Sequence, residues 1–340
     1  MSRLLTIIVP TYNRSACLNM LLEALTVELR GHEDRVDVVI GDNASADDTP
    51  AVTAAFADRW ADTRILRHAE NLGPDENFCR CVEAVRTPYF WIIGDDDLPR
   101  AGAIPALLSM LDIEKPDLVY LSSRWTQTLT SHEEAGRLER LEATRLDRRD
   151  FARRVHVWTT FISGSIVKRS LAPDASLRQF TGSLLVQLGW ILGALRHGSR
   201  FIHVAAPCVL ATSGNSGGYG VLKVFGNNFQ RVTREALAGD AEQRAMAEEI
   251  IRRASIAFLP DLVWGFRQAK AGNFDQKEGI AANLEPQLGS SLAYRWIIRP
   301  LGTAKPSTAG LLLKIAHAAT RLTAMSDRLR ARLGGGMQTL

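Results

Sequence analysis

Residues 89–99 read YFWIIGDDDLP, which is five apolar residues in succession, a glycine and three aspartates. An apolar run of this kind is typical of a β-strand that is buried on both faces of a parallel sheet. The aspartates follow at the point where the strand should end. Because ligands bind at the carboxyl ends of strands in an open parallel sheet, the aspartates lie where a ligand is expected.

Apolar runs that end in polar residues also occur upstream. Strands are predicted at 4–9, 36–40 and 64–68, with helical patterns between them, and a further strand is predicted at 117–121. This alternation of strands and helices predicts a mostly parallel α/β sheet flanked by helices. The polar residues at the successive strand ends are Thr11, Tyr12 and Asn13, then Asp42, then Asn71, then Asp95, Asp96 and Asp97.

The second half of the chain is less regular. Residues 131–154 are rich in Arg and Glu, which predicts a solvated helix or a mobile loop. Strands are expected again at 161–167 and 201–204, with a buried helix at 184–195 between them. After the glycine-rich segment 213–220, nearly everything to the end has a helical pattern.

Composition excludes several classes of protein. The 340 residues carry a formal net charge of only +4, so nucleic-acid binding is not expected. The apolar start breaks at Pro10, and no uncharged stretch is long enough to span a bilayer, which predicts a cytoplasmic protein without a signal peptide. The first strand is followed by PTYNR rather than a glycine-rich phosphate loop, so a nicotinamide dehydrogenase or a P-loop ATPase is disfavoured.

Three adjacent carboxylates repel one another unless a cation neutralises them. Hard divalent ions prefer oxygen ligands, and Mg²⁺ or Mn²⁺ often binds one or two carboxylates together with substrate phosphates. Asp95, Asp96 and Asp97 therefore suggest a metal site. An acidic turn that caps a helix is the alternative, and the run of aspartates by itself leaves both open.

Four segments in this order resemble the family 2 glycosyltransferases of the GT-A fold: TIIVPTYNR (6–14), VVIGDNASADDT (38–49), ENLGPDENF (70–78) and YFWIIGDDDLP (89–99). The GDDD form of the last segment resembles abequosyltransferase-like members, which act on bacterial surface polysaccharides. The resemblance implies a Rossmann-like GT-A sheet with a C-terminal helical extension. It assigns 1–115 to the nucleotide-sugar-binding half, 116–225 to the acceptor-side half and 226–340 to the extension.

The resemblance implies a hexosyl- or deoxyhexosyltransferase that uses Mn²⁺ or Mg²⁺, a nucleoside-diphosphate sugar donor and a saccharide or lipid-linked saccharide acceptor. The residues expected to contact the donor are Pro10, Thr11, Tyr12, Asp42, Asn71, Gly73, Asp95 and Asp96. Asp42 would contact the nucleobase or ribose, and Asn71 and Gly73 would shape the turn beneath the donor. The metal pair of the family's D-x-D motif would be Asp95 and Asp97, or Asp96 and Asp97 in the other register.

The catalytic base is not assigned by the resemblance. Inverting members carry a Glu-Asp pair before a buried helix, and the corresponding residues here are Val186 and Gln187. Glutamine cannot accept the acceptor's proton. Asp174, His156 and His203 are the candidates, with Asp174 the first. A non-catalytic sugar-nucleotide-binding partner is the alternative function, and a nucleotidyltransferase is disfavoured because no basic loop follows the first strand.

The C-terminal segment supports a second hypothesis, peripheral contact of residues 294–333 with the inner face of the cell membrane. The apolar residues that recur at helical spacing are Leu311, Leu312, Ile315, Ala318, Leu322, Met325 and Leu329. The basic residues among and before them are Arg295, Arg299, Lys314, Arg321, Arg328, Arg330 and Arg332, with Tyr294 and Trp296 as interfacial aromatics. A helix packed on the catalytic lobe with a solvated basic side is the alternative.

Overall fold

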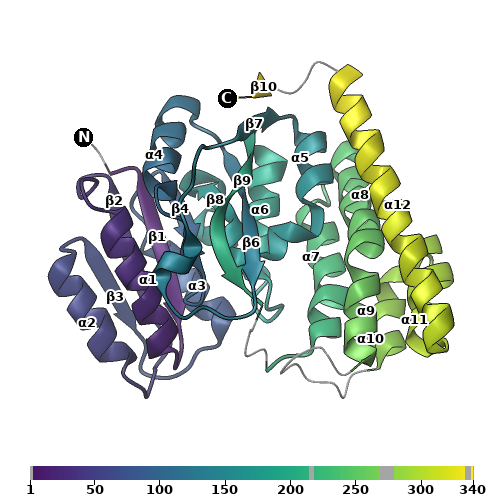
Figure 1. Cartoon of the computed structure of the whole chain (residues 1–340), viewed down its shortest axis with the longest axis horizontal. Helices are drawn as coiled ribbons and strands as arrows, with labels where there is room; N and C mark the ends of the chain where they lie inside the picture. Colours follow the sequence, from purple (N-terminus) through teal and green to yellow (C-terminus); the bar gives the residue numbers. More distant parts are fainter. Residues whose placement is uncertain (1–2, 214–217, 269–278, 334–337, 340) are drawn as a thin grey trace.

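A computed structural model describes residues 3–213, 218–268, 279–333 and 338–339. Figure 1 shows a sheet with helices on both faces and, beside it, a group of C-terminal helices. Within the described residues, ten strands form one sheet, with the order β10-β7-β9-β6-β8-β4-β1-β2-β3 and with β5 paired to β9. The predicted α/β fold with a largely parallel sheet and a helical C-terminal region is confirmed.

The parallel half of the sheet comes from the first quarter of the chain. Its strands are β1 (Leu5–Thr11), β2 (Val36–Asp42), β3 (Thr63–Arg67) and β4 (Tyr89–Ile92). β1 lies between β2 and β4, and β3 lies outside β2, with all pairs parallel. The carboxyl ends of these strands therefore meet at one edge, where Thr11 pairs with Asp42.

Both faces of this half are covered by helices, namely α1 (Ser15–Glu28), α2 (Thr49–Arg59), α3 (Pro74–Glu83) and α4 (Ala103–Glu114). Successive residues of a strand point to opposite faces. Ile8 packs in the layer that contains α3, whereas Ile7 and Val9 pack in the layer that contains α1 and α4. Because both layers are apolar, the strand has a mostly apolar sequence, as predicted.

The other half of the sheet is mixed. It consists of β5 (Leu98–Pro99), β6 (Leu118–Thr126), β7 (Ala143–Leu146), β8 (Ser165–Lys168), β9 (Phe201–Thr212) and β10 (Gln338–Thr339). β8 runs antiparallel between β4 and β6, and β9 runs parallel to β6. The helices α5 (Arg148–Val155) and α6 (Val186–His197) cover this half on the same face as α3.

Two sequence predictions need correction here. The strand expected at 161–167 begins only at Ser165, since Ile162–Gly164 is a 3₁₀ turn (η3). The segment 131–154 is neither one helix nor a loop. It contains the 3₁₀ turn His132–Ala135 (η1), β7 and the start of α5. The sequence pattern did not reveal the short strand β7, because only two of its residues, Ala143 and Leu146, are buried among many Arg and Glu residues.

The C-terminal helices are η6 (Lys223–Asn228), α7 (Phe229–Ala236), α8 (Ala241–Ala257), α9 (Leu259–Arg267), α10 (Ile280–Leu288), η7 (Tyr294–Ile298), α11 (Arg299–Thr303) and α12 (Pro306–Leu333). α7 and part of α8 pack in the same apolar layer as α6. A separate apolar cluster joins α9, α10, η7, α11 and the start of α12. The domain boundaries at 115 and 225 stay predictions. In the parts of the chain that are described, no helix combines the length and apolar character needed to cross a membrane.

Candidate active site

The polar ends of β1 and β4 are joined by short contacts. The Thr11 hydroxyl donates to Asp95 Oδ2 at 2.7 Å. The Arg14 guanidinium lies 2.8 Å from Asp95 Oδ1 and 3.1 Å from Asp96 Oδ2. The structure thus brings Thr11 and Arg14 to Asp95 and Asp96, more than 80 positions further along the sequence. Arg14 was not predicted as a site residue, although it lies in the quoted segment 6–14.

Asp97 is held by a different part of the chain. Its Oδ2 accepts a hydrogen bond from the Ser163 hydroxyl at 2.5 Å, and its Oδ1 accepts one from the backbone N–H of Thr212 at 3.1 Å. The Ser163 oxygen in turn accepts the N–H of Gly94 at 2.8 Å. The turn at Ile162–Gly164 therefore has a clear role, because it directs Ser163 toward the loop that carries Asp95, Asp96 and Asp97 (the aspartate loop). No sequence pattern marked Ser163 or Thr212.

The three aspartates differ in exposure. Asp95 and Asp97 are buried, whereas Asp96 is partly exposed. Burial raises the pKa of Asp95 to about 6, although Arg14 and Thr11 act in the opposite direction. Burial, together with the neighbouring charge of Asp96, raises the pKa of Asp97 to about 7. Additional positive charge at this cluster would therefore stabilise its ionised form.

Carboxylate oxygens are suitable ligands for a hard divalent cation, but the three aspartates of this cluster are not equally free to bind one. Every carboxylate oxygen of Asp95 and Asp97 already accepts a hydrogen bond or faces Arg14. Asp96 borders a cavity of about 200 Å³ that is also lined by Arg14, Cys17 and Thr212. Among the described residues, no three His, Cys, Asp or Glu side chains are grouped so as to hold a metal by themselves. Asp96 could hold the ion if substrate phosphates supply further ligands.

A second polar group lies at the end of β2. Asp42 is buried, and its Oδ1 accepts the N–H of Ser45 at 2.9 Å. Its Oδ2 has no hydrogen-bond partner among the described residues, and the nearest cation, Arg67, is 3.7 Å away. A buried carboxylate oxygen without a donor costs free energy. A ligand that donates a hydrogen bond there would remove that cost.

The turn before α3 lies next to Asp42. Asn43 donates from Nδ2 to Asn71 Oδ1 at 2.8 Å, and its own Oδ1 accepts the N–H of Leu72 at 2.9 Å. Gly73 has φ of 79°, a conformation that favours glycine, and its N–H donates to Asn71 Oδ1. Asn71 and Gly73 are therefore located beside the end of β2, where the resemblance placed the donor.

The remaining two residues predicted to line the nucleotide pocket lie differently. Pro10 is a buried strand residue opposite Gly41. Tyr12, by contrast, is 44% exposed at the same edge of the sheet. Of these two side chains, only that of Tyr12 is available to a ligand.

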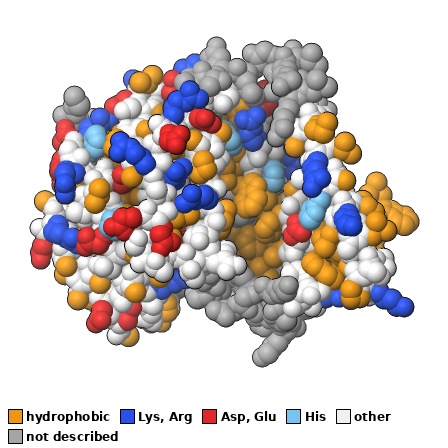
Figure 2. Space-filling view, viewed as in Figure 1, with side chains coloured by type: hydrophobic (Ala, Val, Ile, Leu, Met, Phe, Trp, Pro, Cys, Tyr) orange, Lys and Arg blue, Asp and Glu red, His pale blue; other side chains and the backbone are white. Residues whose placement is uncertain are grey.

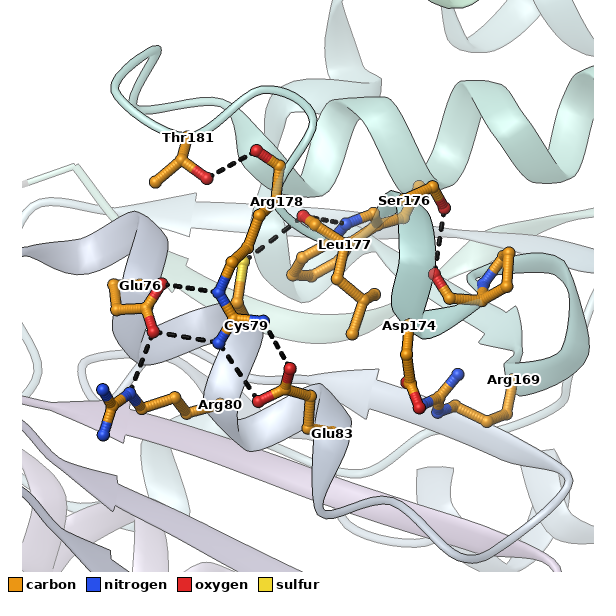
Figure 3. Close-up of polar contacts among 12 residues, drawn as sticks. Glu76, Cys79, Arg80, Glu83, Arg169, Asp174, Ser176, Leu177, Arg178 and Thr181 are labelled. Atoms are coloured by element: carbon orange, nitrogen blue, oxygen red, sulfur yellow. Dashed lines mark hydrogen bonds and ion pairs between the residues drawn. The ribbon is translucent and has the colours of Figure 1, made fainter.

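Asp174 lies at the other edge of the sheet from the aspartate loop. It forms an ion pair with Arg169 (Figure 3). Arg169 follows the end of β8, and its N–H donates to Pro88 just before β4 begins, whereas Asp95 follows the end of β4. The structure therefore does not bring Asp174 to Asp95, Asp96 or Asp97.

The two candidate histidines are also elsewhere. His156 and His203 line a cavity of about 340 Å³ between α5, α8 and α12, together with Arg153 and Arg253. Burial lowers the pKa of each histidine to about 4. A group with so low a pKa is a weak general base. Gln187 is buried at the start of α6, where its Nε2 donates to the Thr160 carbonyl at 3.2 Å.

The lowered pKa values of His156 and His203 predict a loss of stability in acid. Between pH 6.5 and 4 the unfolded chain binds protons that the folded protein excludes, so the free energy of unfolding falls as the pH falls. Each histidine should account for about 1–2 kcal/mol between pH 7 and pH 5. Asp95 and Asp97 act in the opposite direction, because their pKa values are raised in the folded protein.

The histidine contribution is therefore measured as a difference. Urea unfolding of the wild type and of a His156→Gln/His203→Gln variant is compared at pH 7 and pH 5. The carboxylates contribute equally to both proteins, so the wild type should lose more stability on acidification than the variant. Equal losses would show that the histidines are not buried in their neutral form.

Asp75 is a structural residue that sequence reasoning missed, although it lies in the quoted segment ENLGPDENF. It is buried, and its Oδ2 accepts the N–H groups of Gly182 and Leu184 at 2.8 and 2.9 Å. Both of these residues have positive φ, 84° and 59°, which is strained for leucine. Asp75 on α3 thus holds the turn that leads into α6 and Gln187.

Replacing Asp75 by Ala should lower the free energy of unfolding by about 2 kcal/mol, because the N–H groups of Gly182 and Leu184 lose an acceptor at a partly buried place. Asp75→Asn is the matched control, since it keeps one acceptor oxygen and should lose less. Urea unfolding at pH 7 measures both. Equal stability of Asp75→Ala and the wild type would contradict the assigned role.

The comparisons with known proteins concern the family and the fold. Residues 6–173 match the model of glycosyl transferase family 2. The solved structure of S. aureus TarS 1–349 in complex with UDP-GlcNAc is 15% identical with a TM-score of 0.59, and the match covers 97% of this chain and 92% of that one. Mannosyltransferase PcManGT from Pyrobaculum calidifontis, solved with GDP-Man and Mn²⁺, is 17% identical with a TM-score of 0.50 over 94% of this chain and 87% of that one. No curated protein matches the sequence.

The fold, a largely parallel sheet flanked by helices, matches that of GT-A glycosyltransferase structures. The part of the chain that matches the family 2 model, residues 6–173, carries Thr11, Asp42, Asn71 and the three aspartates. At these identities the two solved structures show a shared fold.

Proposed function

We propose that this protein transfers a hexosyl or deoxyhexosyl group from a nucleoside-diphosphate sugar to a saccharide or lipid-linked saccharide acceptor. The observation that carries the proposal is the meeting of three strand ends at one edge. There the buried Oδ2 of Asp42 lacks a hydrogen-bond partner among the described residues, and the partly exposed carboxylate of Asp96 is available to a ligand. TarS with UDP-GlcNAc and PcManGT with GDP-Man and Mn²⁺ support a donor of this class.

In this proposal each residue of the edge has a separate task. Asp42 accepts a hydrogen bond from the nucleoside, and the turn at Asn71 and Gly73 lies beneath the donor. Asp96 holds Mn²⁺ or Mg²⁺, which when bound neutralises charge on the departing diphosphate. Asp95 and Asp97 orient the loop through Thr11, Ser163 and the N–H of Thr212. Arg14 offsets the charge of two carboxylates, so that an anionic donor can approach.

The finer assignments rest on the sequence. The GDDD segment favours an abequosyltransferase-like role in bacterial surface polysaccharide synthesis, at the cytoplasmic face of the membrane. The acceptor would approach from the side of β6 and β9, because Thr212 at the end of β9 contacts Asp97.

A non-catalytic sugar-nucleotide-binding partner is the second candidate. It is favoured by Gln187, which cannot accept a proton and stands where the family's carboxylate pair is expected. In this case the same edge would bind the nucleotide without turnover.

Thermal unfolding with UDP, GDP, CDP and dTDP, each with and without Mn²⁺, tests the donor class. A ligand at 100 times its Kd stabilises the folded protein by about 2.7 kcal/mol. We expect one nucleotide to raise the Tm in the presence of Mn²⁺, and an Asp96→Asn variant to lose that increase.

Release of the nucleoside diphosphate from the matching sugar nucleotide then separates the two candidates. Slow hydrolysis that requires Asp96 supports the enzyme, and binding without hydrolysis supports the non-catalytic partner. No stabilisation by any of the four would contradict both.

A further inference from the structure

We propose that the outer face of α12, together with the segment 292–299, binds an anionic membrane surface. This inference does not rest on the proposed reaction, since none of its residues lies at the edge of the sheet that carries the aspartates. It rests on the two apolar faces of α12, on the neighbouring exposed aromatic residue and on the charge of the region.

α12 has an inner apolar face that is already used. Ala309 and Ala316 are fully buried, and Leu312 and Leu313 pack against the apolar cluster that joins α9, α10, η7 and α11. Thr320, on the same side of the helix, donates to the Ile256 carbonyl of α8. The alternative expected from the sequence was a helix packed on the catalytic lobe, whereas this face of α12 packs on the C-terminal helices α8, α9, η7 and α11.

The opposite face of α12 is apolar too. Leu311, Ile315, Leu322 and Met325 are between 48% and 65% exposed. Their spacing of four, seven and three residues, with Ala318 between them, places them in one stripe along the helix. A helix that is buried on one face normally has a polar opposite face, so this stripe is not explained by packing within the chain.

The stripe has apolar neighbours. Leu292 and Trp296 are 71% and 72% exposed, and η7, which contains Trp296, packs against α12. Half of the large hydrophobic side chains that are exposed in the described part of the chain lie between 292 and 325. Figure 2 shows hydrophobic and basic side chains together over α12, at the right of the molecule. Concentration of this kind marks an interaction surface.

The unpaired charge of the segment 292–326 is positive, and the two carboxylates beside it, Asp261 and Asp327, are paired with His317 and Arg253. Residues 292–326 contain no Asp or Glu and five basic residues, namely Arg295, Arg299, Lys305, Lys314 and Arg321, all of them exposed. Lys314 and Arg321 are two turns apart and flank the stripe on one side. An amphipathic helix with Lys and Arg beside Leu and Trp is suited to the interface of an anionic bilayer. The side chains of Arg328, Leu329, Arg330 and Arg332 lie outside the described part of the chain.

A second copy of the chain is the other occupant to consider, because the spacing of the stripe resembles a coiled-coil seam. Two such helices would bring Lys314 and Arg321 of both copies together, and residues 292–326 supply no carboxylate to pair with them. Like charges at a seam oppose association. The charge therefore favours an anionic lipid surface.

Flotation with lipid vesicles tests the proposal on the full chain. We expect the protein to float with vesicles of phosphatidylcholine and phosphatidylglycerol, to float much less with phosphatidylcholine alone, and to be released by salt. Two variants address the two forces: Leu322→Ser/Met325→Ser removes apolar contact, and Lys314→Glu/Arg321→Glu reverses charge. Each should lower the partition coefficient by about tenfold or more.

Ile113→Ser is the matched control, because Ile113 is 76% exposed on α4, away from this surface, and it should bind vesicles like the wild type. Circular dichroism and the Tm check that every variant folds. Equal flotation with both kinds of vesicle, or none with either, would overturn the proposal. A dimer in light scattering that the Leu322→Ser/Met325→Ser variant dissociates, without vesicle binding, would assign the surface to a second copy.

Discussion

Asp96→Asn should lower the rate of donor hydrolysis or transfer by about 10³-fold, because the variant loses the one carboxylate of the loop that is available to a divalent cation. The free energy of unfolding should change by less than about 1 kcal/mol, since Asp96 is partly exposed and loss of its 3.1 Å ion pair with Arg14 is offset by the loss of its repulsion of Asp95 and Asp97. The expected result is an inactive protein that is as stable as the wild type. Release of nucleoside diphosphate in the presence of Mn²⁺ and urea unfolding measure the two quantities.

Asp58→Asn provides the control, because Asp58 is an exposed aspartate on α2 away from the aspartate loop. It should leave both the rate and the stability unchanged. Full activity of Asp96→Asn would exclude Asp96 as the cation's ligand and would return the D-x-D assignment to Asp95 and Asp97.

Asp97→Ala should produce a different pattern, a loss of activity together with a loss of stability. The substitution leaves the N–H of Thr212 and the hydroxyl of Ser163 without their acceptor in a buried place, at a cost of about 1–3 kcal/mol each. Removal of a buried carboxylate whose pKa is raised to about 7 offsets part of this cost. We therefore expect a net loss of about 2 kcal/mol and at least a 10²-fold lower rate, because the loop that carries Asp96 is no longer held.

Ser163→Ala separates the two effects of Asp97. It removes one of the two donors to Asp97 and keeps the carboxylate. Its loss of activity should be smaller than that of Asp97→Ala, while its Mn²⁺-dependent nucleotide binding persists. If Ser163→Ala and Asp97→Ala were both fully active and stable, the contacts at 2.5 and 3.1 Å would have no part in shaping the site.

The positions of the parallel strands were largely predictable. Each is a run of apolar residues with a polar ending, and both faces of the sheet are covered, so the pattern follows directly from burial. The buried face of α1, with Leu18, Leu21 and Leu25, and the start of α3 at Pro74 were predictable for the same local reasons. The second half was less predictable, because β7 is short and the turn at Ile162–Gly164 is as apolar as a strand.

The site was predictable only in outline. The carboxyl ends of parallel strands lie at one edge of a sheet, so the sequence predicts that Thr11, Asp42 and the aspartates share that edge. The sequence does not predict which aspartate faces solvent, since that depends on Ser163 and Thr212, which are 66 and 115 residues from Asp97. Asp174 shows the same limit. Its residue type suits a base, but only the direction of β8 shows that it lies at the opposite edge.

Local sequence thus determined the parallel strands of the first half, most of the helices and the acidic, polar character of one edge of the sheet, because these depend on residues within a few positions of one another. The tertiary structure decided the roles of individual side chains. It buried Asp95 and Asp97 and left Asp96 accessible, it used Asp75 to hold the turn before α6, and it covered one apolar face of α12 while exposing the other. Each of these outcomes depends on contacts between segments that are distant in sequence, and their partners are chosen by packing rather than by spacing along the chain.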